Sequence, residues 1–325
     1  MRIFNLTLLL TFFIAVFTSC EEDVMIKGEF RHKYILNSVV DGNDSTQIVS
    51  ILENFNVDGI DPSVYTGDNF IGGADVRMWY RDTIYILKDT IITGNDVRGN
   101  SVVMNLYYTD VFKPDYGERI DIEALLPDGR RLNSHTTVPE RVTFPLSSVP
   151  IDDPSRLLPG AYSSRFNIFW NSTNQDQFYR TKFKIIYDKY YAYDDTRRSY
   201  EVPMDYVERN GAEIPVSARV TQDMGGYFNM NALDRAMQKL SEGHPVKSDF
   251  RIFYLTVEVT ILDQFMAAYY SSVGNLEDEY SISLDKTDYT NVDGGLGIFG
   301  SLIKQNFTIY FEPEYIRGFG YQPFY

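Results

Sequence analysis

The chain has 325 residues, of which 44% are hydrophobic and 23% charged, so it can bury a sizeable core and is long enough for two domains. Its formal net charge of −15 excludes partners that are bound through an excess of lysine and arginine, and we expect it to bind neither nucleic acid nor anionic lipid head groups. Its single cysteine excludes an internal disulfide and a cysteine-based zinc cluster.

The amino terminus has the order of a secretory signal. Arg2 supplies a positive charge, and the apolar run at 6–16 that follows is shorter than the roughly 20 residues of a membrane-spanning helix. The four residues that end at Cys20 resemble a bacterial lipobox, with phenylalanine where leucine is usual. We therefore expect 1–19 to be a lipoprotein signal peptide and Cys20 to carry the acyl chains of a stable membrane anchor. The alternative is an ordinary cleaved signal beside an incidental cysteine.

Three acidic residues, Glu21, Glu22 and Asp23, follow the cysteine directly. They resemble the acidic tag that sends Bacteroidota lipoproteins to the outer face of the outer membrane. We expect 20–25 to be a lipidated acidic linker and the protein to be anchored in the outer membrane, facing the exterior. The alternative is a solvated linker that carries no export signal.

Alternation of apolar and polar residues recurs along the chain and predicts half-buried β-strands. Every second residue is apolar in the segments Val102–Tyr108, Ile120–Ala124, Phe166–Trp170 and Leu255–Ile261. An aromatic content of 15% also favours strands. The fold class is therefore predicted to be mainly β.

Three dipeptides that tolerate the positive φ angles of tight hairpins lie between such segments. They are Asp41-Gly42, Asp128-Gly129 and Asn210-Gly211. Hairpins join antiparallel strands, so the predicted sheets are antiparallel.

Two segments have helical rather than strand spacing. After Asn229, apolar residues recur at helical intervals up to Leu240, and Gly243 can end this helix. Asp263 can cap a second helix, which Gly274 can end. We expect both apolar stripes to face the core.

Five prolines crowd the interval 139–159. Because proline cannot donate to a sheet ladder, this interval predicts a domain boundary. We expect an immunoglobulin-like β-sandwich at 26–140, a proline-rich linker at 141–160, and a second β-rich domain with two short helices at 161–325.

The layout resembles a family of Bacteroidota outer-membrane lipoproteins catalogued as domain of unknown function 4249. The segments that carry the likeness are Cys20–Val24, Gly73–Val76, Leu126–Arg130, Thr137–Pro139 and, most specifically, Asn291–Gly300. Members are often encoded beside TonB-dependent receptors, which implies an accessory part in uptake and such a receptor as partner. The resemblance implies no catalytic residue.

The last of these segments contains the literal dinucleotide pattern G-x-G-x-x-G. A strand-like sequence follows it where the nucleotide fold needs a helix, so we expect no nucleotide and no other cofactor. Two interpretations stay open: the glycines let a strand pack closely against another backbone, or the loop docks a partner or ligand. The residues of this candidate loop are Asp293, Gly294, Gly295, Gly297, Phe299 and Gly300.

The remaining chemical candidates are weak. Ser134 and His135 are adjacent, so on a strand their side chains point to opposite faces and cannot form a catalytic pair. Acidic clusters such as 152–153 and 277–279 are typical of solvated loops, although paired carboxylates could hydrolyse glycosides. Oxygen ligands crowd the turn at 41–44, but their spacing matches no known calcium loop. We expect no catalytic residue and no metal.

The sequence thus predicts a non-enzymatic, surface-exposed lipoprotein that serves as an accessory binding component of a TonB-dependent uptake system. The alternative is a structural or adhesive envelope protein without a transport role.

Overall fold

The structure is a computed structural model, and it describes residues 31–55, 69–95, 101–145, 165–189, 196–273 and 289–324. The predicted signal peptide, the acidic linker and most of the proline-rich interval lie outside these residues.

The chain divides into two units, which are Met1–His32 with Asn54–Gly67, and Lys33–Glu53 with Asp68–Tyr325. In the first unit, the Asn54 side-chain amide donates a hydrogen bond of 2.8 Å to the carbonyl oxygen of Arg31. All elements described below belong to the second unit.

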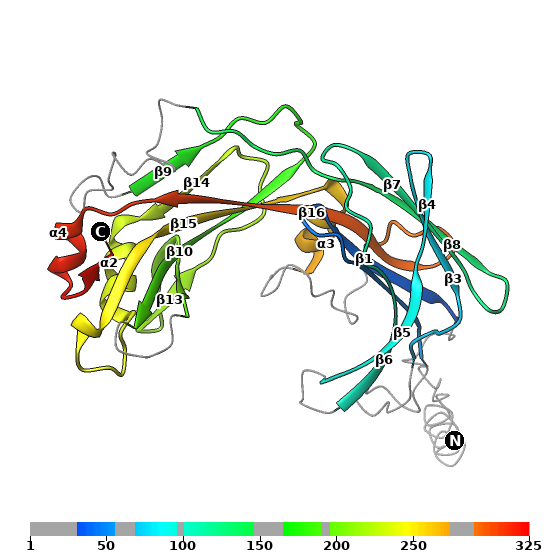
Figure 1. The fold of residues 1–325 in the computed structure, drawn as a ribbon, viewed down its shortest axis with the longest axis horizontal. Helices are drawn as coiled ribbons and strands as arrows, with labels where there is room; N and C mark the ends of the chain where they lie inside the picture. The colour runs from blue at the N-terminus through cyan, green and yellow to red at the C-terminus, as the bar shows by residue number, and fades with distance from the viewer. Residues whose placement is uncertain are drawn as a thin grey trace, which may run out of the picture. The chain divides into compact units, whose positions relative to one another are not determined.

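Among the described residues, strand outweighs helix at 54% against 12%, which confirms the mainly β prediction. The described strands form a nine-stranded sheet, a four-stranded sheet and two two-stranded ribbons (Figure 1). The large sheet consists, in order, of β11 (Arg198–Val202), β10 (Phe178–Lys189), β15 (Phe250–Leu262), β16 (Leu296–Ile309), β1 (Tyr34–Asp41), β2 (Gln47–Glu53), β6 (Ser101–Thr109) and β5 (Lys88–Asn95), and β17 (Gln322–Pro323) pairs with β15. The four-stranded sheet has the order β4 (Thr83–Ile86), β3 (Asp75–Tyr80), β7 (Arg119–Leu125) and β8 (Arg131–Thr137). The ribbons are β12 (Asp205–Arg209) with β13 (Ala212–Val216), and β9 (Arg165–Phe169) with β14 (Gly225–Asn229).

Strand β16 joins parts of the chain that are far apart in sequence. Its residues 296–302 pair in parallel with β1, and its residues 302–309 pair antiparallel with β15 (Figure 1). The prediction of purely antiparallel sheets is therefore wrong for β1–β16, and also for the short pairing of β15 with β17. The reason lies in a continuous buried run at 297–303, because parallel strands are covered on both faces. The linker predicted at 141–160 stays a prediction, while the large sheet contains strands from both sides of it.

The three predicted turns are confirmed as hairpin connections. Asp41-Gly42 follows β1, Asp128-Gly129 joins β7 to β8, and Asn210-Gly211 joins β12 to β13. Asn210 and Gly211 have φ angles of 54° and 76°, as a tight turn with two left-handed residues requires.

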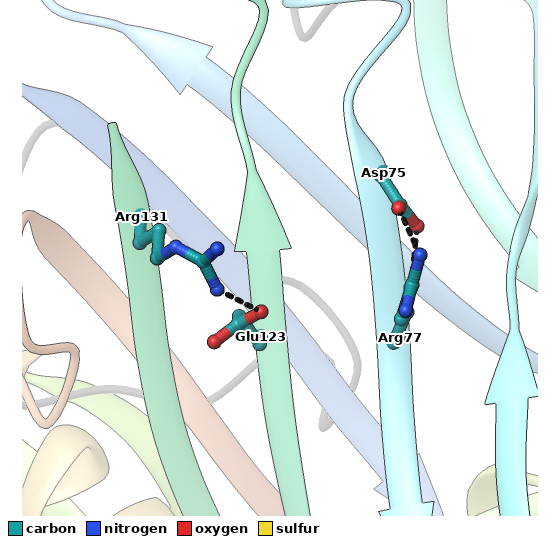
Figure 2. A network of polar contacts seen from close by, with 4 residues as sticks. All are labelled: Asp75, Arg77, Glu123 and Arg131. Atoms are coloured by element: carbon teal, nitrogen blue, oxygen red, sulfur yellow. Dashed lines mark hydrogen bonds and ion pairs between the residues drawn. The ribbon is translucent and has the colours of Figure 1, made fainter. Parts of the chain in front are cut away.

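The four-stranded sheet has one apolar and one charged face. The predicted inward residues Ile120, Ile122 and Ala124 are buried, together with residues of β3 and β8. The opposite face carries ion pairs, among them Arg131 with Glu123 at 2.7 Å and Arg77 with Asp75 at 2.5 Å (Figure 2). These pairs are solvated and contribute little to stability, so the buried face holds this sheet in place.

Strand β6 exists as predicted, but its most deeply buried side chain lies on the other face. Tyr107 is fully buried, whereas Leu106 and Tyr108 are half-buried. The Tyr107 hydroxyl donates to the carbonyl oxygen of Ile71 at 2.7 Å and accepts from the backbone amide of Ala74 at 3.0 Å. A buried tyrosine with a satisfied hydroxyl can therefore reverse a face assigned from alternation alone.

Both predicted helices are confirmed. Helix α2 (Met230–Lys239) is capped by Asn229, whose side-chain oxygen accepts from the Asn231 amide, and helix α3 (Gln264–Val273) is capped by Asp263. Helix α2 ends before Gly243, which lies with a φ of 84° in the turn that follows.

Two further helical elements were not predicted. Helix α4 (Pro313–Gly318) and the 3₁₀ turn η2 (Lys247–Asp249) are too short to show a periodic signal.

Candidate ligand-binding site

The structure places the residues of the predicted partner or ligand loop in two environments, one exposed and one buried. Asp293 and Gly294 are exposed in the turn before β16, and Gly295 is half-buried. Gly297, Phe299 and Gly300 are buried inside the sheet.

The glycines of this segment allow close approach to other backbone. A Cβ atom at Gly294, Gly295 or Gly297 would collide with the carbonyl oxygens of Arg131, Tyr34 and Leu36, respectively. Gly297 also has a φ of 110°, which other residues rarely adopt. Strand β16 begins within the motif and continues beyond it, where a nucleotide-binding fold has a helix. Packing thus accounts for the buried part of the segment.

An asparagine that sequence reasoning missed completes this packing. The Asn291 side chain accepts from the Phe299 amide at 2.9 Å and donates to the Phe299 carbonyl at 2.7 Å. These two hydrogen bonds take the place of those that a neighbouring strand would form with this part of β16.

A buried polar network lies next to the same strand. The Asp263 carboxylate accepts from the Thr136 hydroxyl and, at 2.7 Å, from the Met266 amide, and Thr136 also lies 2.9 Å from the Ser301 hydroxyl. Burial raises the pKa of Asp263 to about 7, although the hydrogen bond from Thr136 opposes this rise. Because Asp263 also caps α3, its protonation state affects the contact between that helix and β8.

The other weak chemical candidates take part in local structure. Ser134 donates to the Asn291 carbonyl at 2.7 Å, while His135 is exposed on the edge strand β8. Asp41 and Asp44 accept hydrogen bonds from backbone amides two residues further on. Among the described residues, no group of three or more histidine, cysteine, aspartate or glutamate side chains could hold a metal ion.

A pocket of about 630 Å³ opens beside the β9–β14 ribbon, in the size range of small-ligand sites. One wall carries Phe169 and Tyr227 from this ribbon, and the strap 216–224 forms another. The strap is fixed to the large sheet because Tyr179 and Thr221 exchange two backbone hydrogen bonds, of 2.7 and 3.0 Å. No sequence motif indicated this pocket.

The floor of the pocket contains bare backbone. Gly225 and Gly226 line it, and a Cβ at Gly226 would lie 2.9 Å from the Thr181 hydroxyl. Thr181 also lines the pocket, is 6% exposed, and has no hydrogen-bond partner among the described residues. The hydroxyl oxygen of Thr181 is open to solvent, so a ligand can bond it in place of water.

Apolar side chains dominate the walls. Phe169 is 57% exposed and Met224 40% exposed, which are high values for apolar side chains, while Met204 and Tyr227 are half-buried. The Arg165 guanidinium lies 4.2 Å above the Tyr227 ring and fixes the plane of that ring. Rigid aromatic faces with adaptable methionines suit a ligand with an apolar body.

Two opposite charges lie on the strap. Arg219 and Asp223 both line the pocket and are exposed. Within the described part of the chain, neither side chain forms an ion pair, with the other or with a third group. The pocket therefore offers one cation and one anion together with an apolar wall.

The predicted lipidation residue Cys20 and the acidic residues Glu21, Glu22 and Asp23 lie outside the described residues. In the described portion, no helix has the length and apolar character needed to cross a membrane.

These features define a mainly β protein with a ligand-sized pocket and no metal cluster among its described residues. The profile of one protein family, described as "Domain of unknown function (DUF4249)", matches residues 21–306. The match spans most of the chain, so the chain belongs to this family, and the predicted resemblance to domain of unknown function 4249 is confirmed. No curated protein matches the chain.

Proposed function

We propose that this protein is a non-enzymatic, surface-exposed lipoprotein of a bacterium of the Bacteroidota that serves as an accessory binding component of a TonB-dependent uptake system in the outer membrane. The observation that carries the binding role is the pocket beside the β9–β14 ribbon, with its apolar wall and its unpartnered Thr181 hydroxyl. The anchor rests on the lipobox-like sequence that ends at Cys20. The proposed export to the cell surface rests on Glu21, Glu22 and Asp23, which follow the cysteine directly.

The proposal includes an immunoglobulin-like sandwich for the amino-terminal part. Strands β1, β2, β6 and β5 lie in one sheet and β4, β3, β7 and β8 in another, and buried side chains of both belong to one core. Two antiparallel sheets around a shared core are the basis of that architecture.

An affinity pull-down of the lipidated protein from detergent-solubilised outer membrane tests the transport role, with Cys20→Ala as the unlipidated control. We expect a TonB-dependent receptor to be recovered with the wild type. Recovery of the lipoprotein alone, while protease still cleaves it on intact cells, would contradict a stable receptor complex and favour the structural or adhesive role.

A further inference from the structure

We propose that the pocket binds short apolar peptides with free termini, with Arg219 holding the peptide carboxylate and Asp223 the ammonium group. This inference deepens the proposed binding function and names its ligand class. It rests on four features of one cavity: the two charges, the aromatic wall, the bare backbone floor and the unpartnered hydroxyl.

The charges favour a ligand that carries both signs. Arg219 and Asp223 lie on the same strap but form no ion pair within 4.0 Å, so each can receive an opposite charge from a ligand. A simple organic anion would leave Asp223 beside a like charge, and a simple cation would do the same to Arg219. A zwitterion satisfies both groups.

The spacing of Arg219 and Asp223 along the chain accommodates a short peptide. Three residues lie between Arg219 and Asp223, so their Cα atoms are at most about 14 Å apart when the chain is extended. In a free amino acid the two charged groups are attached to one carbon atom, whereas in an extended tripeptide they lie about 10 Å apart. Peptides of two to four residues match this range.

The remaining features suit the body of such a peptide. Phe169, Tyr227 and Met224 offer apolar surface to its side chains. The backbone of Gly225 and Gly226 lines the pocket, and the Thr181 hydroxyl beside it can bond a peptide group. A sugar would use the polar groups but would leave much of the apolar wall unmatched.

Isothermal titration calorimetry of the mature chain from residue 20, expressed without the signal, tests the proposal. The probe is leucyl-glycyl-phenylalanine, compared with its N-acetylated and its C-amidated forms. We expect the free peptide to bind at least tenfold more tightly than either blocked form, since each blocked form loses one charge.

Two variants separate the two charge contacts. In Arg219→Gln, the amidated peptide should bind as tightly as the free peptide, while the penalty of acetylation remains. In Asp223→Asn, the acetylated peptide should bind as tightly as the free one, while the penalty of amidation remains. The matched control Arg209→Gln, in the β12–β13 hairpin, should leave all three affinities unchanged.

Absence of binding by all three peptides, or equal affinity for free and blocked peptides, would overturn the proposal. Loss of affinity in both variants without this crossed pattern would overturn the assigned contacts. Circular dichroism melting curves that match the wild type establish that the variants are folded. Calorimetry needs neither membrane nor receptor, and the pull-down needs no peptide, so failure of this inference can be told apart from failure of the transport role.

Discussion

Two strands of this protein carry glycines that other side chains could not replace without collision, and the two sets serve different ends. In β16, a Cβ at Gly297 would strike the carbonyl oxygen of Leu36, which belongs to the neighbouring strand. In β14, a Cβ at Gly226 would meet the side chain of Thr181 at the floor of a pocket. The first set permits close packing of one strand on another, and Gly226 permits the Thr181 side chain to pack against the floor of a pocket. Glycines in a strand therefore mark a close approach, and only the neighbouring atoms decide what that approach is for.

The largest expected effect is that of Gly297→Ala. The variant combines an unfavourable φ angle with a clash against backbone that cannot move aside, so we expect a loss of at least about 4 kcal/mol in the free energy of unfolding. Urea denaturation measures this loss. Gly129→Ala is the control, because Gly129 has a φ of 87° but nothing within 4 Å, and it should cost only about 1 kcal/mol. Equal losses in the two variants would contradict the role of close packing.

The second effect concerns the Asp263 carboxylate. It packs against Gly300 of β16, where an added Cβ atom would lie 3.3 Å from it. The pKa of Asp263 is about 7 in the folded protein against an ordinary value of 3.8, so its contribution to stability is complete below pH 3.8 and is lost as the pH rises through 7. From pH 5 to pH 8 this group should lower the unfolding free energy by about 2 kcal/mol.

The Asp263→Asn variant isolates that contribution, because an asparagine can keep the cap on α3 without titrating. Denaturation at a series of pH values should give a difference between wild type and variant that changes with pH in this sense. A difference that stays constant from pH 5 to pH 8 would show that Asp263 does not titrate in this range.

The third effect tests the asparagine that covers the edge of β16. Asn291→Ala removes two hydrogen bonds to Phe299 and leaves the backbone groups of that residue without these partners. We expect a loss of about 2 kcal/mol in unfolding free energy. Amide hydrogen exchange at Phe299 should become faster than at β16 residues that pair with β15, and unchanged exchange there would argue against the role of Asn291.

The smallest effect on stability is expected for a substitution of Gly226, the glycine at the pocket. In Gly226→Ala the new methyl group meets a side chain that can rotate, so we expect a loss of about 1 kcal/mol or less. Affinity for leucyl-glycyl-phenylalanine should nevertheless fall at least tenfold, because the methyl group displaces the Thr181 side chain that lines the pocket. An unchanged affinity would place the peptide elsewhere.

Local sequence signals were sufficient for much of the fold. The alternation in Ile120–Ala124 and Leu255–Ile261, the hairpin dipeptides and the caps at Asn229 and Asp263 each act over a few residues, and the structure agrees with them. The parallel pairing of β1 with β16 could not be predicted in this way, because it joins segments 261 residues apart at the contact of Asn37 with Ile298.

Local sequence signals were even less able to predict the candidate site. The conspicuous motif at 291–300 drew attention to glycines whose buried members serve packing. The pocket takes its lining from β9, β10, β14, the strap and Met204, and none of these segments has an unusual sequence by itself. Residues such as Thr181 and Arg219 become candidates only when the fold brings them to one cavity.

The pairing of β1 with β16 also has a consequence for biogenesis. Strand β1 is among the first parts of the fold to be synthesised, and its parallel partner among the last. Until the ribosome has completed β16, the edge of β1 has no partner, and an exposed edge invites aggregation. Folding of the large sheet must wait for the whole chain, which makes it slow. Such a delay leaves the polypeptide unfolded for longer, as the export that we propose would require.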